Sequence, residues 1–299
     1  MNSQIKELPT LGVGASLSLS ADPDPVQLAG TIGGPSFIEY AGQVGVESVI
    51  EEISQITATG TTVLFHPAYI NFCGSFANSS AWLEQTAHHI ETVQSPWFAQ
   101  DLAYCFWQGG AGYATQLGNF LPPIFNQNSL QLAITRIQEV QATIPATVAI
   151  EPPPVTFIVG DIPLFEFFGE LAIATDCALL LDMGHLVSYE MASGARVLDA
   201  LAALPCERVI EVHIAGGRLE QGDATPIYID AHESAILDQT WQMFIALLPL
   251  LPNLKAVCYE CEGMDEQTVR HTLEKIRQLV RQHSSANALV ARLDEIDKP

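Results

Sequence analysis

Residues 147–182 read TVAIEPPPVTFIVGDIPLFEFFGELAIATDCALLLD. Two short apolar runs, TVAIE at 147–151 and ALLLD at 178–182, flank a helical pattern at 163–174, and each run ends in a carboxylate. The prolines at 152–154 end the first run, because proline lacks the backbone N–H that a sheet requires. Near-continuous apolar strands joined by a helix are typical of parallel strands that are covered on both faces. We therefore predict a strand–helix–strand unit here.

The same alternation of strand and helix extends over most of the chain. Strands are predicted at residues 11–16, 36–40, 62–66, 97–102, 147–151, 178–182, 208–214 and 254–260, and helices at 46–57, 80–93, 129–143, 163–174, 195–203, 238–250 and 265–282. Eight such strands in 299 residues favour a single-domain α/β protein, a (β/α)8 barrel, over an open sheet. We assign the barrel to residues 1–284 and expect residues 285–299 to form a polar, flexible tail.

Six of the predicted strands end in a histidine or an acid. These residues are His66, Asp101, Glu151, Asp182, His213 and Glu260; Glu39 has the equivalent place on strand 36–40, His185 follows in LLLDMGH, and Asp230 and His232 lie in YIDAH. Because the C-terminal ends of barrel strands meet at one mouth, these side chains are expected to converge. One strand-end acid is ordinarily a helix cap or a solvated charge, but so many carboxylates at one mouth would repel one another. A bound cation removes that cost, so we predict a metal site.

The ligand types narrow the choice of metal. Carboxylates mixed with imidazoles suit iron, manganese or zinc. Cys258 and Cys261 form a CxxC pair on a predicted strand, where residues three apart point to opposite faces, so the pair is not expected to chelate a metal. The candidates outnumber the ligands that one ion needs, which indicates two or three ions with Glu151 as a bridging carboxylate.

Charge and composition limit the partners. The chain has 12 Lys plus Arg and 34 Asp plus Glu, a formal net charge of −22. Such a field repels nucleic acid and anionic membrane surfaces. The N-terminus lacks the basic start and apolar core of a secretory signal, and the apolar stretch at 243–251 is too short to span a bilayer. We therefore expect a cytoplasmic protein with no nucleic-acid or membrane partner, and no disulfide framework among the six cysteines.

Seven segments resemble the multinuclear non-heme iron-dependent oxidative enzymes, whose best-known member is the iron oxidase of methanobactin biosynthesis. They are GVGASLSL (12–19), SFIEY (36–40), VLFHP (63–67), AIEPP (149–153), LLLDMGH (179–185), VIEVHIAG (209–216) and YIDAHESAILDQTW (228–241). The last two are the most specific. The resemblance covers most of the chain and implies a TIM barrel. It also implies that the iron ligands are His66, Glu151, Asp182, His213, Asp230, His232 and Glu260.

Two positions depart from the family pattern. The family commonly has a Glu-His pair at the end of the fourth strand, whereas this chain has Gln100 and Asp101, which offers oxygen in place of nitrogen. After the sixth strand the family often reads Asp-Val-Asn-Asn, whereas this chain reads Asp-Met-Gly-His, a form also common in sugar isomerases and epimerases of similar fold. Asp101 and His185 are therefore additional candidate ligands.

The resemblance implies O2-dependent modification of one residue of a ribosomally synthesised precursor peptide in natural-product biosynthesis. Cys is the usual target, and Asp or Asn in some members. The implied cofactor is two or three iron ions in a mixed Fe(II)/Fe(III) state, with O2 as co-substrate and with Glu151, Asp182, His213 and Glu260 at the catalytic centre. Family members often act with a small partner protein that presents the leader peptide. The long loops at 67–80, 108–127 and 216–229 are expected to form a peptide-binding rim.

Three other functions fit parts of the pattern. A divalent-metal sugar isomerase or epimerase of the xylose-isomerase-like TIM-barrel type would use only Glu151, Asp182, His213 and Glu260, so the surplus of ligands counts against it. A metal-dependent nuclease is disfavoured by the charge of −22 and the scarcity of arginine. A metal-binding or peptide-binding module without catalysis remains a third alternative. The sequence leaves open the peptide, the product, the number of irons and the oligomeric state.

Overall fold

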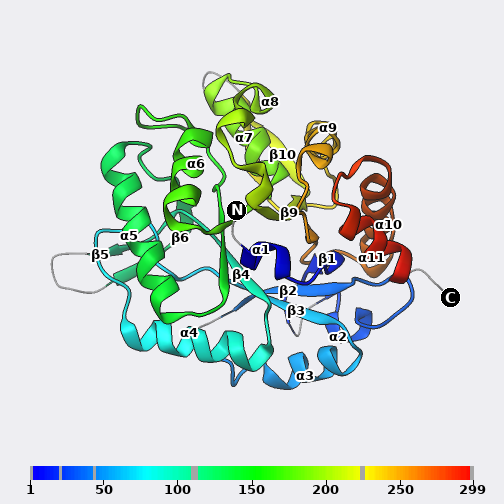
Figure 1. The fold of residues 1–299 in the computed structure, drawn as a ribbon. Coiled ribbons are helices and arrows are strands. Elements are labelled where there is room, and N and C mark those ends of the chain that lie inside the picture. The colour runs from blue at the N-terminus through cyan, green and yellow to red at the C-terminus, as the bar shows by residue number, and fades with distance from the viewer. Residues whose placement is uncertain (1–2, 20–21, 43–44, 109–113, 223–225, 297–299) are drawn as a thin grey trace.

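Eight parallel strands close into a barrel. The computed structural model describes residues 3–19, 22–42, 45–108, 114–222 and 226–296. The strands follow the order β1-β12-β9-β8-β7-β4-β3-β2 around the barrel, and helices surround it (Figure 1). Their bounds are β1 Gly12–Ser16, β2 Phe37–Gly42, β3 Thr62–Pro67, β4 Trp97–Asp101, β7 Thr147–Glu151, β8 Ala178–Asp182, β9 Val209–Ala215 and β12 Ala256–Glu260. The (β/α)8 barrel expected from the sequence is confirmed.

The helices form the outer layer. They are α1 Ser3–Glu7, α2 Pro25–Leu28, α3 Ile50–Ala58, α4 Ser80–Val93, α5 Gln127–Thr143, α6 Leu164–Thr175, α7 Met183–Ser193, α8 Val197–Ala200, α9 Asp238–Leu247, α10 Glu266–His283 and α11 Asn287–Ile296, with 3-10 turns η1 Leu201–Ala203, η2 Cys206–Arg208 and η3 Leu248–Leu250. Side-chain caps fix several helix starts: Asn126 accepts a hydrogen bond from the Ser129 N–H, and Asp265 accepts one from the Thr268 N–H. Among the described residues no helix is long and apolar enough to cross a membrane.

The barrel interior is apolar toward the N-terminal ends of the strands and polar at the mouth formed by their C-terminal ends. Side chains along a strand alternate between the two faces, so Trp97 and Ala99 of β4 belong to the apolar interior and Asp101 follows them at the C-terminal end. Ile5 of the short helix α1 joins the same apolar cluster and closes the opposite end of the barrel, where Figure 1 shows α1 at the centre. The interior therefore leaves the C-terminal mouth as the place where polar side chains gather.

Two predicted loops contain β-hairpins instead. After β4 the chain forms β5 Tyr104–Gln108 and β6 Ala114–Leu121, and after β9 it forms β10 Gly217–Gln221 and β11 Pro226–Asp230; both pairs are antiparallel. Residues 109–113 and 223–225 of the expected loops lie outside the described residues. Glycine, glutamine and asparagine in these stretches favour loops locally, whereas antiparallel pairing between two such segments supplies the backbone hydrogen bonds that order them.

Helix α7 was not predicted. It begins directly after β8, where Asp182 is both the last strand residue and the helix N-cap, accepting from the His185 N–H. Every residue from Met183 to Tyr189 is buried, so the helix lacks the one-sided apolar pattern that identifies a surface helix. The helix expected at 195–203 is the shorter pair α8 and η1.

The C-terminal segment differs from the expected polar tail. Most of it is helix α11, in which Leu289 and Leu293 are buried, and the helix packs against α10 and β1. Ala286, Leu289 and Leu293 are spaced by three and four residues, which gives one narrow apolar face among charged neighbours. Residues 297–299 lie outside the described part of the chain.

Candidate metal centre

The six predicted strand-end side chains lie together at the C-terminal mouth of the barrel. Ala149 belongs to the apolar interior and Glu151 points the same way two residues later, as the alternation of strand side chains requires. The register of the parallel strands then places these side chains at the same height along the barrel: Asp101 of β4 lies opposite Glu151 of β7, and Asp182 of β8 lies opposite His213 of β9. Strand register alone therefore brings residues up to 112 positions apart to one rim (213 − 101 = 112).

The convergent side chains form four overlapping groups. In each group one ligand atom of every residue lies within 4.8 Å of the others; the groups are Glu39–His66–His213, His66–Asp101–Glu151, Glu151–Asp182–His185 and Asp182–His213–Glu260. Each neighbouring pair of groups shares one residue, namely His66, Glu151, Asp182 or His213. The groups therefore form a closed ring, an arrangement that suits several cations with shared ligands better than one ion.

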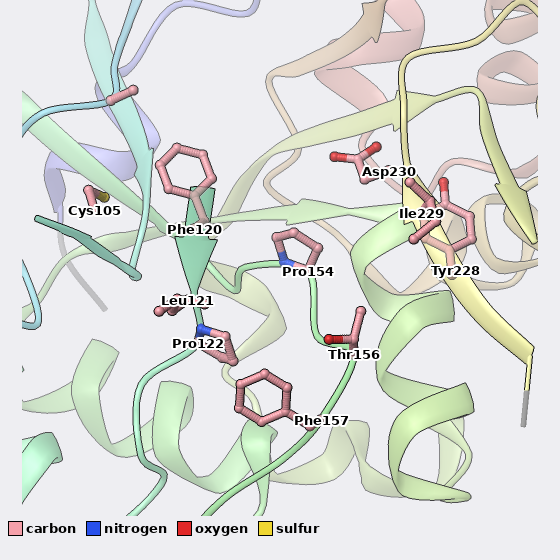
Figure 2. Close-up of a pocket in the computed structure, with 11 residues that line it drawn as sticks. Cys105, Phe120, Leu121, Pro122, Pro154, Thr156, Phe157, Tyr228, Ile229 and Asp230 are labelled. Carbon is pink, nitrogen blue, oxygen red and sulfur yellow. The ribbon is translucent and has the colours of Figure 1, made fainter. Parts of the chain in front are cut away.

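The β10–β11 hairpin adds two side chains at the rim of this ring. Asp230 Oδ2 lies 3.2 Å from His185 Nε2 and 3.7 Å from His232 Nε2, and His232 Nε2 lies 3.5 Å from Glu260 Oε2. His232 has a φ of 46°, in the left-handed region that few residues other than glycine adopt. Asp230 also lines a neighbouring cavity, shown in Figure 2. The structure thus brings Asp230 and His232 next to the strand-end set, and their role as metal ligands remains a prediction.

Buried polar atoms in the ring lack hydrogen bonds. Within the described part of the chain, His66 Nδ1, Asp101 Oδ1, Asp182 Oδ2, His213 Nε2 and Asp230 Oδ1 are buried without a partner. A buried polar group without a hydrogen bond costs free energy, and a buried charge costs more. Cations bound to these carboxylate oxygens would offset both costs, whereas His66 Nδ1 and His213 Nε2 face the Glu39 carboxylate. A mixed oxygen and imidazole set suits transition metals. The residues present therefore fit a metal cluster.

The carboxyl groups of the ring have shifted pKa values. Burial, with the negative charge of Asp101, raises the pKa of Glu151 to about 8. Burial, with the charges of Glu260 and Asp230, raises the pKa of Asp182 to about 7. Without a cation these groups retain protons near neutral pH, and a bound cation would displace them.

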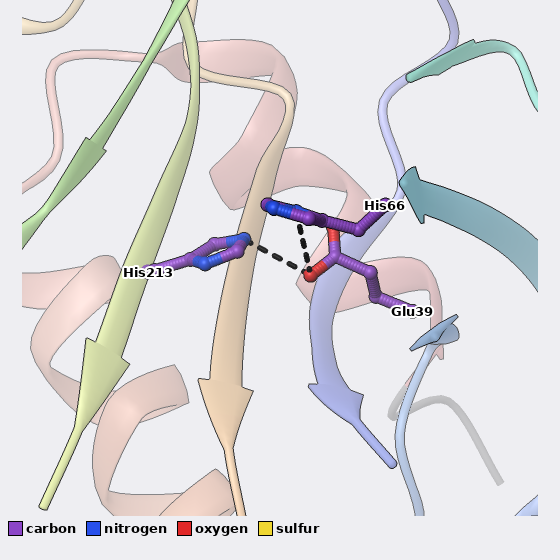
Figure 3. A group of neighbouring side chains, drawn as sticks. All are labelled: Glu39, His66 and His213. Atoms are coloured by element: carbon purple, nitrogen blue, oxygen red, sulfur yellow. Dashed lines mark ion pairs between the residues drawn. The ribbon is translucent and has the colours of Figure 1, made fainter. Parts of the chain in front are cut away.

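Glu39 lies behind two of the candidate histidine ligands. Its Oε1 is 3.1 Å from His213 Nε2 and 3.6 Å from His66 Nδ1, as Figure 3 shows. The other ring nitrogens face away from it: His213 Nδ1 lies 3.2 Å from Glu260, and His66 Nε2 lies 3.9 Å from Glu151. Although burial raises the pKa of the Glu39 carboxyl, the two imidazoles outweigh this and hold it well below its usual range. A carboxylate placed behind a ligating histidine orients the ring.

Glu211 was not anticipated from the sequence. It lies on β9 two residues before His213, with Oε1 at 3.8 Å from His213 Nε2, and its other oxygen accepts a 2.6 Å hydrogen bond from Trp97 Nε1. Burial and the nearby Glu39 raise the pKa of Glu211 to about 7. Its position could have been noticed in the sequence, because an acid in the middle of a buried strand needs a hydrogen-bonding partner inside the barrel.

His185 has one nitrogen fixed by the backbone. Its Nδ1 lies 2.9 Å from the Pro152 carbonyl oxygen, which only accepts hydrogen bonds, so Nδ1 carries the proton. Nε2 lies between two carboxylates, Asp230 at 3.2 Å and Asp182 at 3.8 Å. Although burial lowers the pKa of His185, these carboxylates raise it well above its usual value. The structure places His185 beside the strand-end residues, and its role as an additional ligand remains a prediction.

The two residues that end β4 point in different directions. Asp101 faces the ring, with Oδ1 at 3.8 Å from His185 Nδ1. Gln100 turns away and hydrogen-bonds both backbone groups of Ile70, at 2.9 and 2.7 Å. Gln100 therefore holds the loop after β3, and Asp101 is the member of the pair that is available to a metal.

The fold and the site define a class: a (β/α)8 barrel with a carboxylate–histidine cluster at its C-terminal mouth. Solved structures with this fold include a xylose isomerase domain protein from Planctomyces limnophilus, with a TM-score of 0.61, 11% identity, and coverage of 92% of this chain and 99% of that chain. Endonuclease IV from Thermus thermophilus has a TM-score of 0.59 and 16% identity, and the match covers 91% of this chain and 99% of that chain. D-psicose 3-epimerase from Clostridium cellulolyticum has a TM-score of 0.54 and 11% identity. The match covers 96% of this chain and 100% of that chain. These similarities establish the fold alone.

The sequence identifies the family within this class. Residues 39–284 match the family of the RiPP precursor modification enzyme MbnB/TglH/ChrH, where RiPP denotes a ribosomally synthesised and post-translationally modified peptide. The match spans most of the chain, so the protein belongs to this family.

Curated relatives match a shorter region. A UPF0276 protein of Vibrio parahaemolyticus is 28% identical over 168 residues, which are 56% of this chain and 57% of the relative. A UPF0276 protein of Rhizobium meliloti is 31% identical over 146 residues, 47% of each chain. The chain thus spans about half the length of these curated relatives.

Proposed function

We propose that this protein is a multinuclear iron, O2-dependent oxidase that modifies one residue of a ribosomally synthesised precursor peptide, either Cys or Asp/Asn. The single observation that carries the proposal is the closed ring of four overlapping ligand groups. Membership of the RiPP precursor modification family supports a peptide as the substrate. The mixture of imidazole and carboxylate ligands supports iron as the metal.

Three ions would be held by overlapping ligand sets in which Glu151 and Asp182 are shared. His66 and Asp101 share Glu151 with the group of Asp182 and His185, so Glu151 is suited to bridge two ions. His213 and Asp182 form a further group with Glu260. Asp230 and His232, which lie beside Glu260, complete a set for a third ion. Bound iron would supply the activation of O2 and the oxidising capacity, whereas the protein fixes the ligands and leaves positions open for the substrate.

The protein also shapes the space in which the substrate residue would react. A cavity of about 170 Å³ over the ring is lined by most of its candidate ligands and by Ser16, Ala41 and Phe120. Its size suits one small side chain, such as that of Cys or Asp.

The test of this activity is O2 consumption with a defined peptide. The iron-loaded protein is mixed with O2 and with candidate precursor peptides that contain Cys, Asp or Asn, and O2 uptake and the peptide mass are followed. The proposal expects O2 uptake that depends on the peptide and a mass change on one residue, Cys or Asp/Asn. O2 uptake that is the same without peptide, or an unmodified peptide after full iron loading, would contradict it.

A divalent-metal sugar isomerase or epimerase is the second candidate. One observation favours it: Asp182, His213 and Glu260 form a compact group beside Glu151, which suits two acids flanking one metal in proton transfer next to a carbonyl. The remaining candidate ligands would then have no role, and the larger neighbouring cavity is lined mainly by apolar side chains, which suits a sugar poorly. One Mn or Mg per chain with no iron, together with aldose–ketose turnover, would favour this function.

A further inference from the structure

A second, larger cavity adjoins the metal centre. It has a volume of about 440 Å³, which lies within the usual range for small-molecule pockets. Three segments of the barrel mouth line it: the end of β6, residues 154–157 after β7, and the end of β11. In Figure 2 the rings of Phe120, Pro122 and Phe157 lie along one side, and Tyr228 to Asp230 lie along the other.

The cavity adjoins the space over the metal centre, because Ala68, Phe120, Pro154 and Asp230 line both. A peptide with one residue over the metal ring would bring a neighbouring residue close to the larger cavity. The two spaces together suit adjacent side chains of one peptide.

The chemistry of the cavity selects an apolar group. Among its lining residues Asp230 alone is charged, and its carboxylate faces His185 and His232 at the boundary with the metal centre. Cys105 is buried, and burial raises the pKa of its thiol to about 12, so it contributes neither charge nor a nucleophile. A charged side chain would lose its hydration here without a partner.

Part of the apolar wall is exposed. Leu121 is 44% exposed and Phe157 is 51% exposed, and both lie at the cavity. Ile124 and Val159, at 44% and 50% exposure, flank the bridge between residues 125 and 160. Covering exposed apolar side chains removes apolar area from water, which favours the binding of an apolar group.

The wall is held in place by the metal centre. The Pro152 carbonyl accepts a hydrogen bond from His185 Nδ1, and the Val155 N–H donates to Ser188 Oγ, so helix α7 fixes both ends of residues 152–155. Prolines at 152–154 and 122–123 further restrict the backbone on both sides. A wall that is rigid before binding does not lose conformational freedom when a ligand enters.

We propose that this cavity binds a bulky apolar side chain, aromatic or branched, of the precursor peptide, next to the residue that is modified. The proposal rests on the proposed function for the identity of the ligand as a peptide. It adds a sequence preference that the metal ligands do not supply: the residue beside the modified one is large and uncharged.

The preference is tested by binding, without turnover. Capped peptides Ac-Gly-X-Cys-Gly-NH2 and Ac-Gly-Cys-X-Gly-NH2, with X as Phe, Gly, Lys or Glu, are titrated anaerobically into the iron-loaded protein by calorimetry. In one of the two series Phe is expected to bind about tenfold more tightly than Gly, which corresponds to about 1.4 kcal/mol, because an aromatic side chain buries apolar area that Gly lacks. Lys and Glu are expected to bind less tightly than Phe.

Variants locate the effect in the cavity. Thr156→Trp fills the cavity from its wall and Leu121→Lys places a charge there, and both are expected to remove the Phe preference while leaving the iron content unchanged. Leu250→Lys is the matched control for the charge, because Leu250 is also 44% exposed but lies in η3, before the N-terminal end of β12. It is expected to keep the preference.

The outcomes separate this inference from the proposed activity. A Phe preference that both cavity variants abolish, without any oxidation of the peptide, supports the cavity and contradicts the oxidase. Oxidation with equal binding of the Phe and Gly peptides, or a preference that survives in Thr156→Trp, overturns the inference and leaves the oxidase standing. Tighter binding of Lys or Glu than of Phe, or no binding by any peptide, also overturns it.

Discussion

Single side chains at the barrel mouth form the candidate metal centre, and Glu39 lies behind two of its histidines. Because its carboxylate lies 3.1 Å from His213 and 3.6 Å from His66, it is a positioning residue for both imidazoles. We predict that Glu39→Gln lowers iron affinity by about 10–100-fold, the usual effect of losing a partner behind a metal ligand. Iron content measured by competition with a chelator checks this.

The control for Glu39→Gln is Glu51→Gln, which removes the same charge from an exposed position on α3. Glu39→Asp keeps the charge and is expected to restore part of the affinity. Equal iron affinity in Glu39→Gln and in the unaltered protein would mean that Glu39 does not position the metal-binding histidines.

His213 is one of four residues that belong to two ligand groups each, so its removal disturbs two groups at once. We predict that His213→Ala lowers the bound metal by at least one ion per chain and abolishes activity, while circular dichroism still reports a folded barrel. Metal analysis of the purified variant is the measurement. If its metal content is unchanged, His213 is not a ligand.

Asp101 belongs to one group only, with His66 and Glu151. We predict that Asp101→Ala loses one ion and keeps those held by the other groups, and that turnover falls because that ion is missing. Metal content and turnover that both match the unaltered protein would reduce Asp101 to a strand-end acid.

Most of these residues follow from the sequence, because strand alternation and parallel register together determine which side chains meet at the mouth. Glu211 did not follow, since its role depends on Trp97, which lies 114 positions away. The tautomer of His185 also required the structure, because it depends on the Pro152 carbonyl.

Elements that pack by tertiary contacts were harder to predict than the strands. The strands β7 and β8 were predicted to the residue because apolar runs with a sharp stop define them. Helix α7 is buried over two turns and therefore lacks an amphipathic pattern. The hairpins β5–β6 and β10–β11 depend on pairing between segments of weak strand propensity, which no local signal reports.

The C-terminal helix α11 offers a test at this scale. We predict that Leu289→Ala lowers the free energy of unfolding by about 2–5 kcal/mol, because the leucine is buried against the barrel. Thermal or urea unfolding checks this. Leu250→Ala, at a position 44% exposed, is the control and is expected to have little effect. A stability change equal to that of the control would mean that residues 287–296 behave as the flexible tail that the sequence suggested.

The whole molecule combines a rigid barrel with a strongly negative charge. Bound cations would lower the electrostatic cost of both the net charge of −22 and the ring of buried carboxyl groups. The barrel class was predictable from eight alternating units. The closure of its lower end by Ile5 of α1 was not, because a five-residue helix carries no periodic signal.

A polynuclear iron centre at the barrel mouth is the central claim. The most direct measurement is metal analysis with Mössbauer spectroscopy on protein purified anaerobically after expression with ⁵⁷Fe. The expected result is two or three irons per chain, with spectra that contain both Fe(II) and Fe(III) components. A single ion per chain, or full occupancy by zinc, manganese or magnesium with only trace iron, would contradict the account.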